Sequence, residues 1–391
     1  MAFPASAHRS PLPSPALATL LHEAVVGAGV ARAAAAGFAV WTGGRWEVEV
    51  GACGKTDRGA ASVATIFDLA SVSKPFVAVA FARLVERGTL AANALLGDLL
   101  PEVSGTWAAK ASLEALLSHR AGLASHVRLF APLEGRRPIR RLEALRHAAD
   151  SPRDEARAAG AGAAFPPVYS DLGYFLAGTA LARAAGVELD QLVMAEVSEP
   201  LGLGAGSARQ WLAAQRDFSA RVAPTEVVPF RGGQIRGVVH DENAWALAGH
   251  GLAGQAGLFG TVEDVLGFGV ALLDGLAGRR SDWLTARTIE GLLVERPLGT
   301  LRLGFDGKAS ANSSAGPSAS AHTFGHLGFT GTSLWCDPAA DAVSVLLTNR
   351  VCPTRENVAI RACRPEVHES LFARASERRG RANPTNSPRA Y

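Results

Sequence analysis

Hydrophobic and polar positions alternate near the start of the chain. Residues 37–42 are mostly apolar, a glycine pair follows at 43–44, and residues 45–52 then alternate polar with apolar side chains. A period of two around a glycine turn predicts a β-hairpin. Residues 76–87 are instead apolar on almost all sides and stop at Gly88, which predicts a buried helix.

The rest of the chain divides by its pattern into a helical middle and a strand-rich end. Ala/Leu/Arg segments at helical spacing dominate residues 90–285, whereas the segments 333–338 and 342–349 read as strands and 356–375 as a helix. We therefore predict an α/β (α+β) protein whose sheet is completed by its C-terminal part. The expected divisions are a disordered N-terminus (1–14), a discontinuous α/β domain (15–90 and 286–375) that opens with a helix over 15–35, a mainly helical inserted domain (91–285) and a disordered basic tail (376–391).

Composition narrows the functional classes. The chain has 391 residues, of which 48% are hydrophobic and 19% charged, with a formal net charge of +3. No stripe of Lys and Arg interleaved with aromatics precedes the tail, so nucleic acid is not an expected partner. No apolar run reaches the roughly 18–20 residues that span a bilayer, so stable membrane insertion is not expected. The first 26 residues make a poor secretory signal, and we expect a cytoplasmic protein.

Metal and redox chemistry find little support. The four cysteines form no C-x-x-C pair, so free thiols are expected. His240 and His250 flank the polar segment 241–243, which invites a metal interpretation, but such a segment in a Gly/Ala-rich loop is more often a turn or a helix cap. No metal and no organic cofactor is expected.

The first chemical signal is the pair Ser71 and Lys74. Residues three apart lie on one side of a helical turn, and Pro75 places both in the first turn of a helix. Free N–H groups there favour negative charge on a serine oxygen. A serine needs a base, and Lys74 can serve if burial and neighbouring cations lower its pKa. This spacing also occurs by chance, yet only four of the 39 Lys+Arg residues are lysine, and an arginine could not act as a base.

Two further elements are weaker alone. Tyr169 begins the segment Y-S-D-L-G-Y, and a phenol beside an ammonium group can relay protons; the alternative is a half-buried tyrosine before a helix that Ser170 or Asp171 caps. The glycine-rich segment 325–333 leads into an apolar strand, where backbone N–H groups could complete an oxyanion hole. The alternative there is a plain glycine turn.

Taken together and in this order, the segments resemble the serine β-lactamase and penicillin-binding-protein superfamily, in particular its class C β-lactamase-like branch, which includes esterases, D-aminopeptidases and DD-peptidases. The resemblance covers about residues 30–360. Its motifs are F-D-L-A-S-V-S-K-P-F (67–76), L-L-S-H-R-A-G-L (116–123), Y-S-D-L-G-Y (169–174), H-D-E-N-A (240–244), A-G-L-F (256–259) and G-H-L-G-F-T-G-T-S-L-W (325–335) before Asp337-Pro338.

The resemblance implies an antiparallel sheet flanked by helices, and an acyl-enzyme on Ser71. It implies that Lys74 and Tyr169 share the general acid and base work, and that the N–H groups of Ser71 and Phe329 hold the oxyanion. Asp171, His326, Gly328 and Phe329 are the expected substrate-binding residues; Asp171 stands where the family often has asparagine.

His326 stands where true β-lactamases have the lysine of their K-T-G element. A neutral histidine binds a substrate carboxylate less well than lysine does. We therefore expect a serine hydrolase that cleaves a small-molecule ester, amide or peptide more readily than a β-lactam. The competing hypothesis is a catalytically silent relative that binds a peptidoglycan fragment; an α/β-hydrolase is disfavoured because no G-x-S-x-G element is present.

Overall fold

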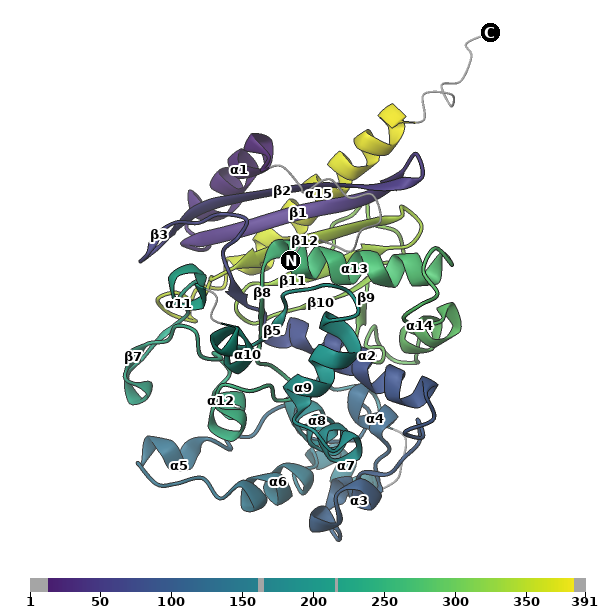
Figure 1. Ribbon diagram of the computed structural model, residues 1–391. Helices are drawn as coiled ribbons and strands as arrows, with labels where there is room; N and C mark the ends of the chain where they lie inside the picture. The colour runs from purple at the N-terminus through teal and green to yellow at the C-terminus, as the bar shows by residue number, and fades with distance from the viewer. Residues whose placement is uncertain (1–12, 161–164, 215–216, 383–391) are drawn as a thin grey trace.

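The computed structural model describes residues 13–160, 165–214 and 217–382 (Figure 1). The predictions of disorder at the two ends fall largely on residues 1–12 and 383–391, outside the described residues. No helix among the described residues is long and apolar enough to cross a membrane.

A seven-stranded antiparallel sheet forms one half of the molecule, and β1 pairs with β12 at its centre. The predicted hairpin is confirmed: β1 and β2 pair from Ala33↔Gly54 to Thr42↔Arg45. Gly43 and Gly44 turn between them with φ of 57° and 80°, a backbone that favours glycine. In spatial order the strands are β3 (Gly59–Ala60), β2 (Arg45–Thr56), β1 (Ala33–Thr42), β12 (Ala342–Thr348), β11 (Ser333–Asp337), β10 (Phe324–Leu327) and β9 (Asp306–Gly307).

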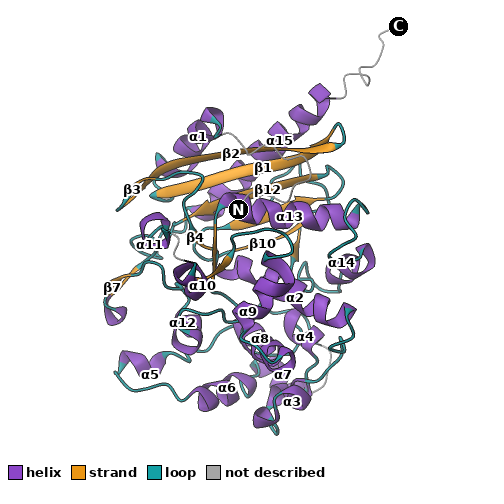
Figure 2. Cartoon of the chain, viewed as in Figure 1, coloured by secondary structure: helices purple, strands orange, loops and turns teal. Residues whose placement is uncertain are grey.

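Helices cover both faces of this sheet (Figure 2). The terminal helices α1 (Pro15–Leu21) and α15 (Ile360–Ala382) pack on one face, and α13 (Val262–Leu276) packs on the other. Gly269 allows this approach, since a Cβ there would lie 2.6 Å from a methyl group of Val343.

The structure differs from the expected elements in three places. α13 falls within the expected helical domain (91–285), yet it belongs to the sheet layer because its apolar face packs on β12 and β1. The helix expected over 15–35 ends earlier, in α1 and a π-turn (His22–Val26), because residues from Ala33 onward pair between two strands. α15 continues to Ala382, beyond the expected limit of 375.

The other half is mainly helical and lies below the sheet in Figure 1. The predicted buried helix is α2 (Ser73–Glu86), and its Phe76 stacks on Phe268 of α13 at 3.9 Å. The other α-helices are α3 (Leu96–Leu99), α4 (Leu113–Leu117), α5 (Ala131–Glu134), α6 (Arg141–Ala149), α7 (Asp154–Ala159), α8 (Asp171–Ala185), α9 (Leu189–Val193), α10 (Ala208–Ala213), α11 (Phe218–Arg221), α12 (Glu242–Ala248) and α14 (Ala286–Leu293). Short strands join the halves: β4 (Phe67–Asp68), β5 (Gly206–Ser207) and β8 (Leu258–Gly260) form one sheet, β6 (Val227–Val228) and β7 (Gly233–Gln234) another.

Candidate active site

Ser71 lies in a short 3₁₀ turn (Ala70–Val72) that leads directly into α2. Ala70 has a φ of 48°, a strained backbone for a residue with a side chain. The buried carboxylate of Asp68 holds this turn, because it accepts hydrogen bonds from the N–H groups of Ala70 (2.8 Å) and His240 (2.6 Å). The nucleophile turn is therefore tied to the loop before α12.

Lys74 is completely buried and faces Ser71. Its Nζ donates to Ser71 Oγ at 2.9 Å, to Asp171 Oδ1 at 2.8 Å and to the carbonyl oxygen of Gln255 at 3.2 Å. The structure thus brings together the serine and the lysine of the first motif and the acid of the second.

The condition stated for Lys74 as a base, a lowered pKa, is not met in the resting site. Burial acts to lower the pKa of Lys74, but the carboxylate of Asp171, with a smaller contribution from Tyr169, raises it above its usual value. The resting site therefore holds an ammonium group. Asp171 was expected to bind substrate, and one of its oxygens is instead occupied by Lys74.

Tyr169 precedes α8 and sits in a stack of aromatic rings. The ring of His119 stacks on it at 4.6 Å, the ring of His326 lies 6.0 Å away, and Lys74 Nζ lies 4.7 Å from its centre. Ser170 N-caps α8 through a bond from the N–H of Gly173, as the capping interpretation expected. Burial raises the pKa of Tyr169, with Lys74 opposing this in part, so the phenol is protonated at neutral pH.

The glycine-rich segment adjoins the nucleophile turn through two threonine hydroxyls. Thr330 donates to the carbonyl oxygen of Asp68 at 2.7 Å, and Thr332 donates to that of Leu69 at 2.8 Å. Gly328 is required in this contact, because a Cβ there would overlap Thr332 and lie 2.6 Å from Leu69 O. These bonds place residue 329 beside the nucleophile.

The backbone N–H groups of Ser71 and Phe329 donate no hydrogen bond to another described residue. Both residues line the same cavity. Unpaired N–H groups at a cavity wall are the donors that an oxyanion hole requires. The Phe329 side chain is 49% exposed, between the ring of His240 and the guanidinium of Arg350.

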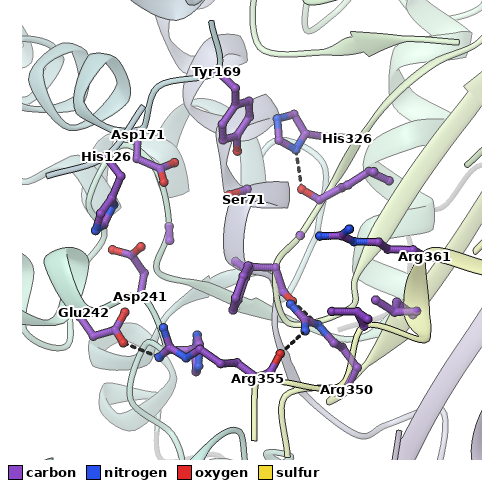
Figure 3. A pocket seen from close by; sticks show the side chains of 18 of the residues that line it. Ser71, His126, Tyr169, Asp171, Asp241, Glu242, His326, Arg350, Arg355 and Arg361 are labelled. Atoms are coloured by element: carbon purple, nitrogen blue, oxygen red, sulfur yellow. Dashed lines mark hydrogen bonds and ion pairs between the residues drawn. The ribbon is translucent and has the colours of Figure 1, made fainter. Parts of the chain in front are cut away.

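His326 is buried and neutral. Burial, together with the charge of Lys74, lowers its pKa to about 3. Its Nδ1 lies 2.8 Å from the carbonyl oxygen of Leu327, which can only accept (Figure 3). The proton is therefore on Nδ1, and Nε2 is an acceptor at the position where the resemblance led us to compare this histidine with a lysine.

A cavity of about 720 Å³ opens at Ser71. In Figure 3, carboxylates lie on one side of Ser71 and guanidinium groups lie on the other and below. The acids that line the cavity are Asp171, Asp241, Glu242 and Asp306; the arginines are Arg128, Arg350, Arg355, Arg361 and Arg364, of which Arg128 forms an ion pair with Glu134.

Three of these arginines form no ion pair with a described acid, and Arg350 donates only to the backbone carbonyls of Phe329, Arg355 and Asn357. Arg361 is exposed and forms no ion pair. Arg364 is buried, its Nη2 donates to the carbonyls of Gly328 and Thr332, and its Nε has no partner. Burial lowers the pKa of Arg364 to about 10, so it remains charged. Arg355, in contrast, is neutralised by Glu226 and Glu242.

Sequence reasoning missed several residues of this site. Asp68 and His119 lie within quoted motifs, but no role was assigned to them; His119 accepts the N–H of Ser170 on Nδ1 at 3.0 Å and has a strained φ of 60°. Arg361 and Arg364 come from a C-terminal helix that carried no chemical signal. Gln255 contributes through its carbonyl, which residue type does not reveal.

The segment considered for a metal has another role. Asp241 N-caps α12 by accepting the N–H of Ala244 at 2.7 Å, as the capping interpretation predicted. His240 contacts Glu226 at 2.9 Å. Within residues 13–160, 165–214 and 217–382, no three His, Cys, Asp or Glu side chains gather so as to hold a metal ion.

Comparison with proteins of known name finds relatives by sequence. An N-acetylmuramyl-L-alanine amidase of Bacillus subtilis (strain 168) is 28% identical over 309 residues, which cover 73% of this chain and 68% of the amidase. A Salmonella heidelberg (strain SL476) protein, provisionally named a D-alanyl-D-alanine carboxypeptidase, is 29% identical over 195 residues. That match covers 47% of this chain and spans less than half, 45%, of the relative.

The fold is that of a class C β-lactamase from Rhodobacter sphaeroides, with a TM-score of 0.63 at 19% identity over 91% of this chain and 99% of the other. The family model described as Beta-lactamase matches residues 22–363. The predicted resemblance and fold class are thereby confirmed. The chain belongs to the beta-lactamase family and is a serine hydrolase of that family.

Proposed function

We propose that this protein hydrolyses an ester or amide of a small molecule or peptide through an acyl-enzyme on Ser71. The observation that carries the proposal is the 2.9 Å hydrogen bond between Lys74 Nζ and Ser71 Oγ at the wall of the cavity. A serine and a buried amine in contact are a nucleophile with its base. The names of the two curated relatives, an amidase and a carboxypeptidase, favour an amide.

The proposed chemistry has two steps. In the first, Ser71 Oγ attacks the carbonyl carbon while neutral Lys74 takes its proton, and the N–H groups of Ser71 and Phe329 receive the negative charge on the carbonyl oxygen. The proton then passes through Tyr169 to the leaving group as the carbonyl–leaving-group bond breaks. In the second, water attacks the ester of Ser71, gives up a proton to the same groups, and the serine is restored.

The resting Lys74 is an ammonium and must lose a proton before it acts. Asp171, at 2.8 Å, is the acceptor in direct contact. A proton moved from Lys74 to Asp171 leaves the net charge of the buried pair unchanged, so it costs less desolvation than release of the proton to solvent. An asparagine at this position could not accept that proton.

The substrate-binding side of the proposal follows from the cations of the cavity. His326 offers an acceptor, which suits an N–H or O–H of the substrate. Arg361 and Arg364 have no acidic partner, and an anionic group on the leaving side would neutralise them. This supports a substrate with a carboxylate held by arginine in place of the lysine that position 326 lacks.

The test is intact mass after incubation with a fluorophosphonate and, separately, with a penicillin. We expect a fluorophosphonate adduct on the wild type and none on Ser71→Ala, with p-nitrophenyl acetate hydrolysis lost in parallel. A folded wild type that takes neither label would favour the silent binder of a peptidoglycan fragment. Ser73→Ala is the matched control, although Ser73 Oγ accepts the N–H of Leu258, so its stability must be checked.

A further inference from the structure

We propose a second ligand site, separate from the cavity at Ser71, for a small molecule that has an apolar body and one carboxylate or phosphate group. The site is a cavity of about 960 Å³ at the end of β2 beside β3 (Figure 1), and it is larger than the cavity at Ser71. A cavity of this volume accommodates a drug-sized molecule. The site does not depend on the chemistry proposed for Ser71.

One segment, residues 349–358, forms a wall between the two cavities. Three of its residues line the cavity at Ser71, and five others line the second cavity: Asn349, Cys352, Pro353, Thr354 and Asn357. Asn349 Oδ1 accepts the N–H of Ala33 at 2.9 Å, and Asn357 Nδ2 donates to the carbonyl oxygen of Gly29 at 2.9 Å. These bonds tie the wall to β1 and to the loop before it, so the cavity is already formed without a ligand.

Two cations of the second cavity are unpaired. Arg32 and Lys55 line it, and neither side chain forms a hydrogen bond or an ion pair with a described residue. Asp57 is the only acid among the described residues that line it, and Arg236 forms an ion pair with that carboxylate. The cavity therefore keeps an excess of positive charge, which an anionic ligand would balance.

The charge of Arg32 acts on the interior of the cavity. Cys352 is 6% exposed, and its Sγ lies 3.6 Å from Gln234 Nε2 in the cavity wall. Burial raises the pKa of the Cys352 thiol, and the charges of Arg32 and Arg236 oppose this rise. A charge shifts a neighbouring pKa in this way at short range, so Arg32 faces the same space as Cys352. A guanidinium in that place binds a carboxylate or a phosphate through two parallel hydrogen bonds.

The rest of the wall suits an apolar body. The amides of Asn349 and Asn357 are already used within the protein, so they leave the polar group of a ligand to Arg32 and Lys55. Apolar side chains from three separate segments supply the other contacts: Val26, Val30, Ala31, Pro224 and Pro353. An amphipathic anion therefore fits this cavity better than an inorganic ion does.

The test compares two dyes that fluoresce when bound in apolar surroundings. 1-Anilinonaphthalene-8-sulfonate is an anion, and N-phenyl-1-naphthylamine has the same aromatic body without the sulfonate. We expect Arg32→Gln or Lys55→Gln to weaken binding of the anionic dye by about 2–5-fold, and both together by about 5–25-fold, the range for exposed charge pairs. The neutral dye should bind every variant equally. Both side chains are exposed and unpaired, so the variants should fold like the wild type.

The dye is located with a second variant and with a thiol reagent. Arg361→Gln is the matched control, because Arg361 is an exposed and unpaired arginine of the cavity at Ser71; it should leave the affinity for the dye unchanged. Cys53 is half-buried and lines the second cavity. The anionic dye should slow the alkylation of Cys53 by N-ethylmaleimide, with the same half-saturation as the fluorescence.

The site would be overturned by equal affinity of the anionic dye for the wild type and the double variant, or by alkylation of Cys53 that the dye does not slow. Loss of affinity in Arg361→Gln alone would also overturn it, because the dye would then occupy the cavity at Ser71. Octanoate and octyl phosphate finally test the ligand class. Displacement of the dye by either one supports the proposal and identifies the preferred anion, and displacement by neither would contradict it.

Discussion

The ion pair between Lys74 and Asp171 gives a prediction about pH. Asp171→Asn removes a negative charge and keeps the size and one acceptor of the side chain. The pair is 2.8 Å long, Lys74 is completely buried and Asp171 is 23% exposed, so solvent screens the attraction little. An opposite charge at such range shifts a pKa by about 1–3 units, or ~1.4–4 kcal/mol.

The direction of the pH dependence follows from the protonation state in which Lys74 acts as a base. Lys74 accepts a proton only as a neutral amine, and Asp171 stabilises the ammonium. In the wild type, kcat/KM should therefore rise with pH through neutrality. In Asp171→Asn, burial still disfavours the charged form of Lys74, but the carboxylate that opposed this effect is gone. The pKa of Lys74 therefore falls below its usual value, and the acid limb of the kcat/KM profile moves down by about 1–3 pH units.

The substitution Asp171→Asn should lower the stability of the fold, although it extends activity to lower pH. A lysine whose pKa is raised in the folded state contributes stability that is complete below its unfolded pKa and is lost as pH rises through the folded pKa. Asp171→Asn removes that contribution at neutral pH, and an unpaired buried charge costs about 3–5 kcal/mol. The variant should melt earlier while its acid limb moves down.

The assay is p-nitrophenyl acetate hydrolysis between pH 5 and 10 on protein shown to be folded by circular dichroism. Asp98→Asn, an exposed acid in α3, is the control and should leave the limb in place. If the limb of Asp171→Asn stays or moves upward, Lys74 is not the titrating base, and the reasoning from this ion pair is refuted.

Three other substitutions test the walls of the site. Gly328→Ala should displace the N–H of Phe329 and lower kcat by about 10²–10³-fold in steady-state assays, whereas Gly291→Ala, with open space around it, should not. Asp68→Asn can no longer accept both N–H groups that hold the nucleophile turn; we expect about 1–3 kcal/mol less stability by urea unfolding, and an unchanged midpoint would contradict the role given to this carboxylate. His326→Lys should speed penicilloyl adduct formation by about 10–100-fold in timed mass spectra, since a charged hydrogen bond to the carboxylate is gained; no gain would mean that the arginines already supply the cation.

Local pattern predicted local structure well. The hairpin of β1 and β2 and the buried helix α2 follow from periods of two and of 3.6, which depend only on neighbours in the chain. The spacing of Ser71 and Lys74 likewise became a hydrogen bond, because both lie within one helical turn.

Features set by distant partners could not be predicted. The sequence predicts α13 as a helix but not the sheet face on which it packs. Asp171 lies 97 positions from Lys74, and only the fold shows that the acid binds the lysine and raises its pKa. Arg361 and Arg364 reach the cavity because α15 crosses the sheet, which no local period indicates.

The two threonine hydroxyls that bond the carbonyls of Asp68 and Leu69 have a consequence for how the enzyme is made. The contacts join segments 262 and 263 residues apart, and β1 at the centre of the sheet pairs with β12 near the other end of the chain. A ribosome that has produced the nucleophile helix has therefore not yet supplied its oxyanion donor or the neighbour of β1. Pairings of such long range form late in folding. Hydrolytic activity should thus appear only when synthesis is nearly complete, and a nascent chain would remain inactive while its serine is already in place.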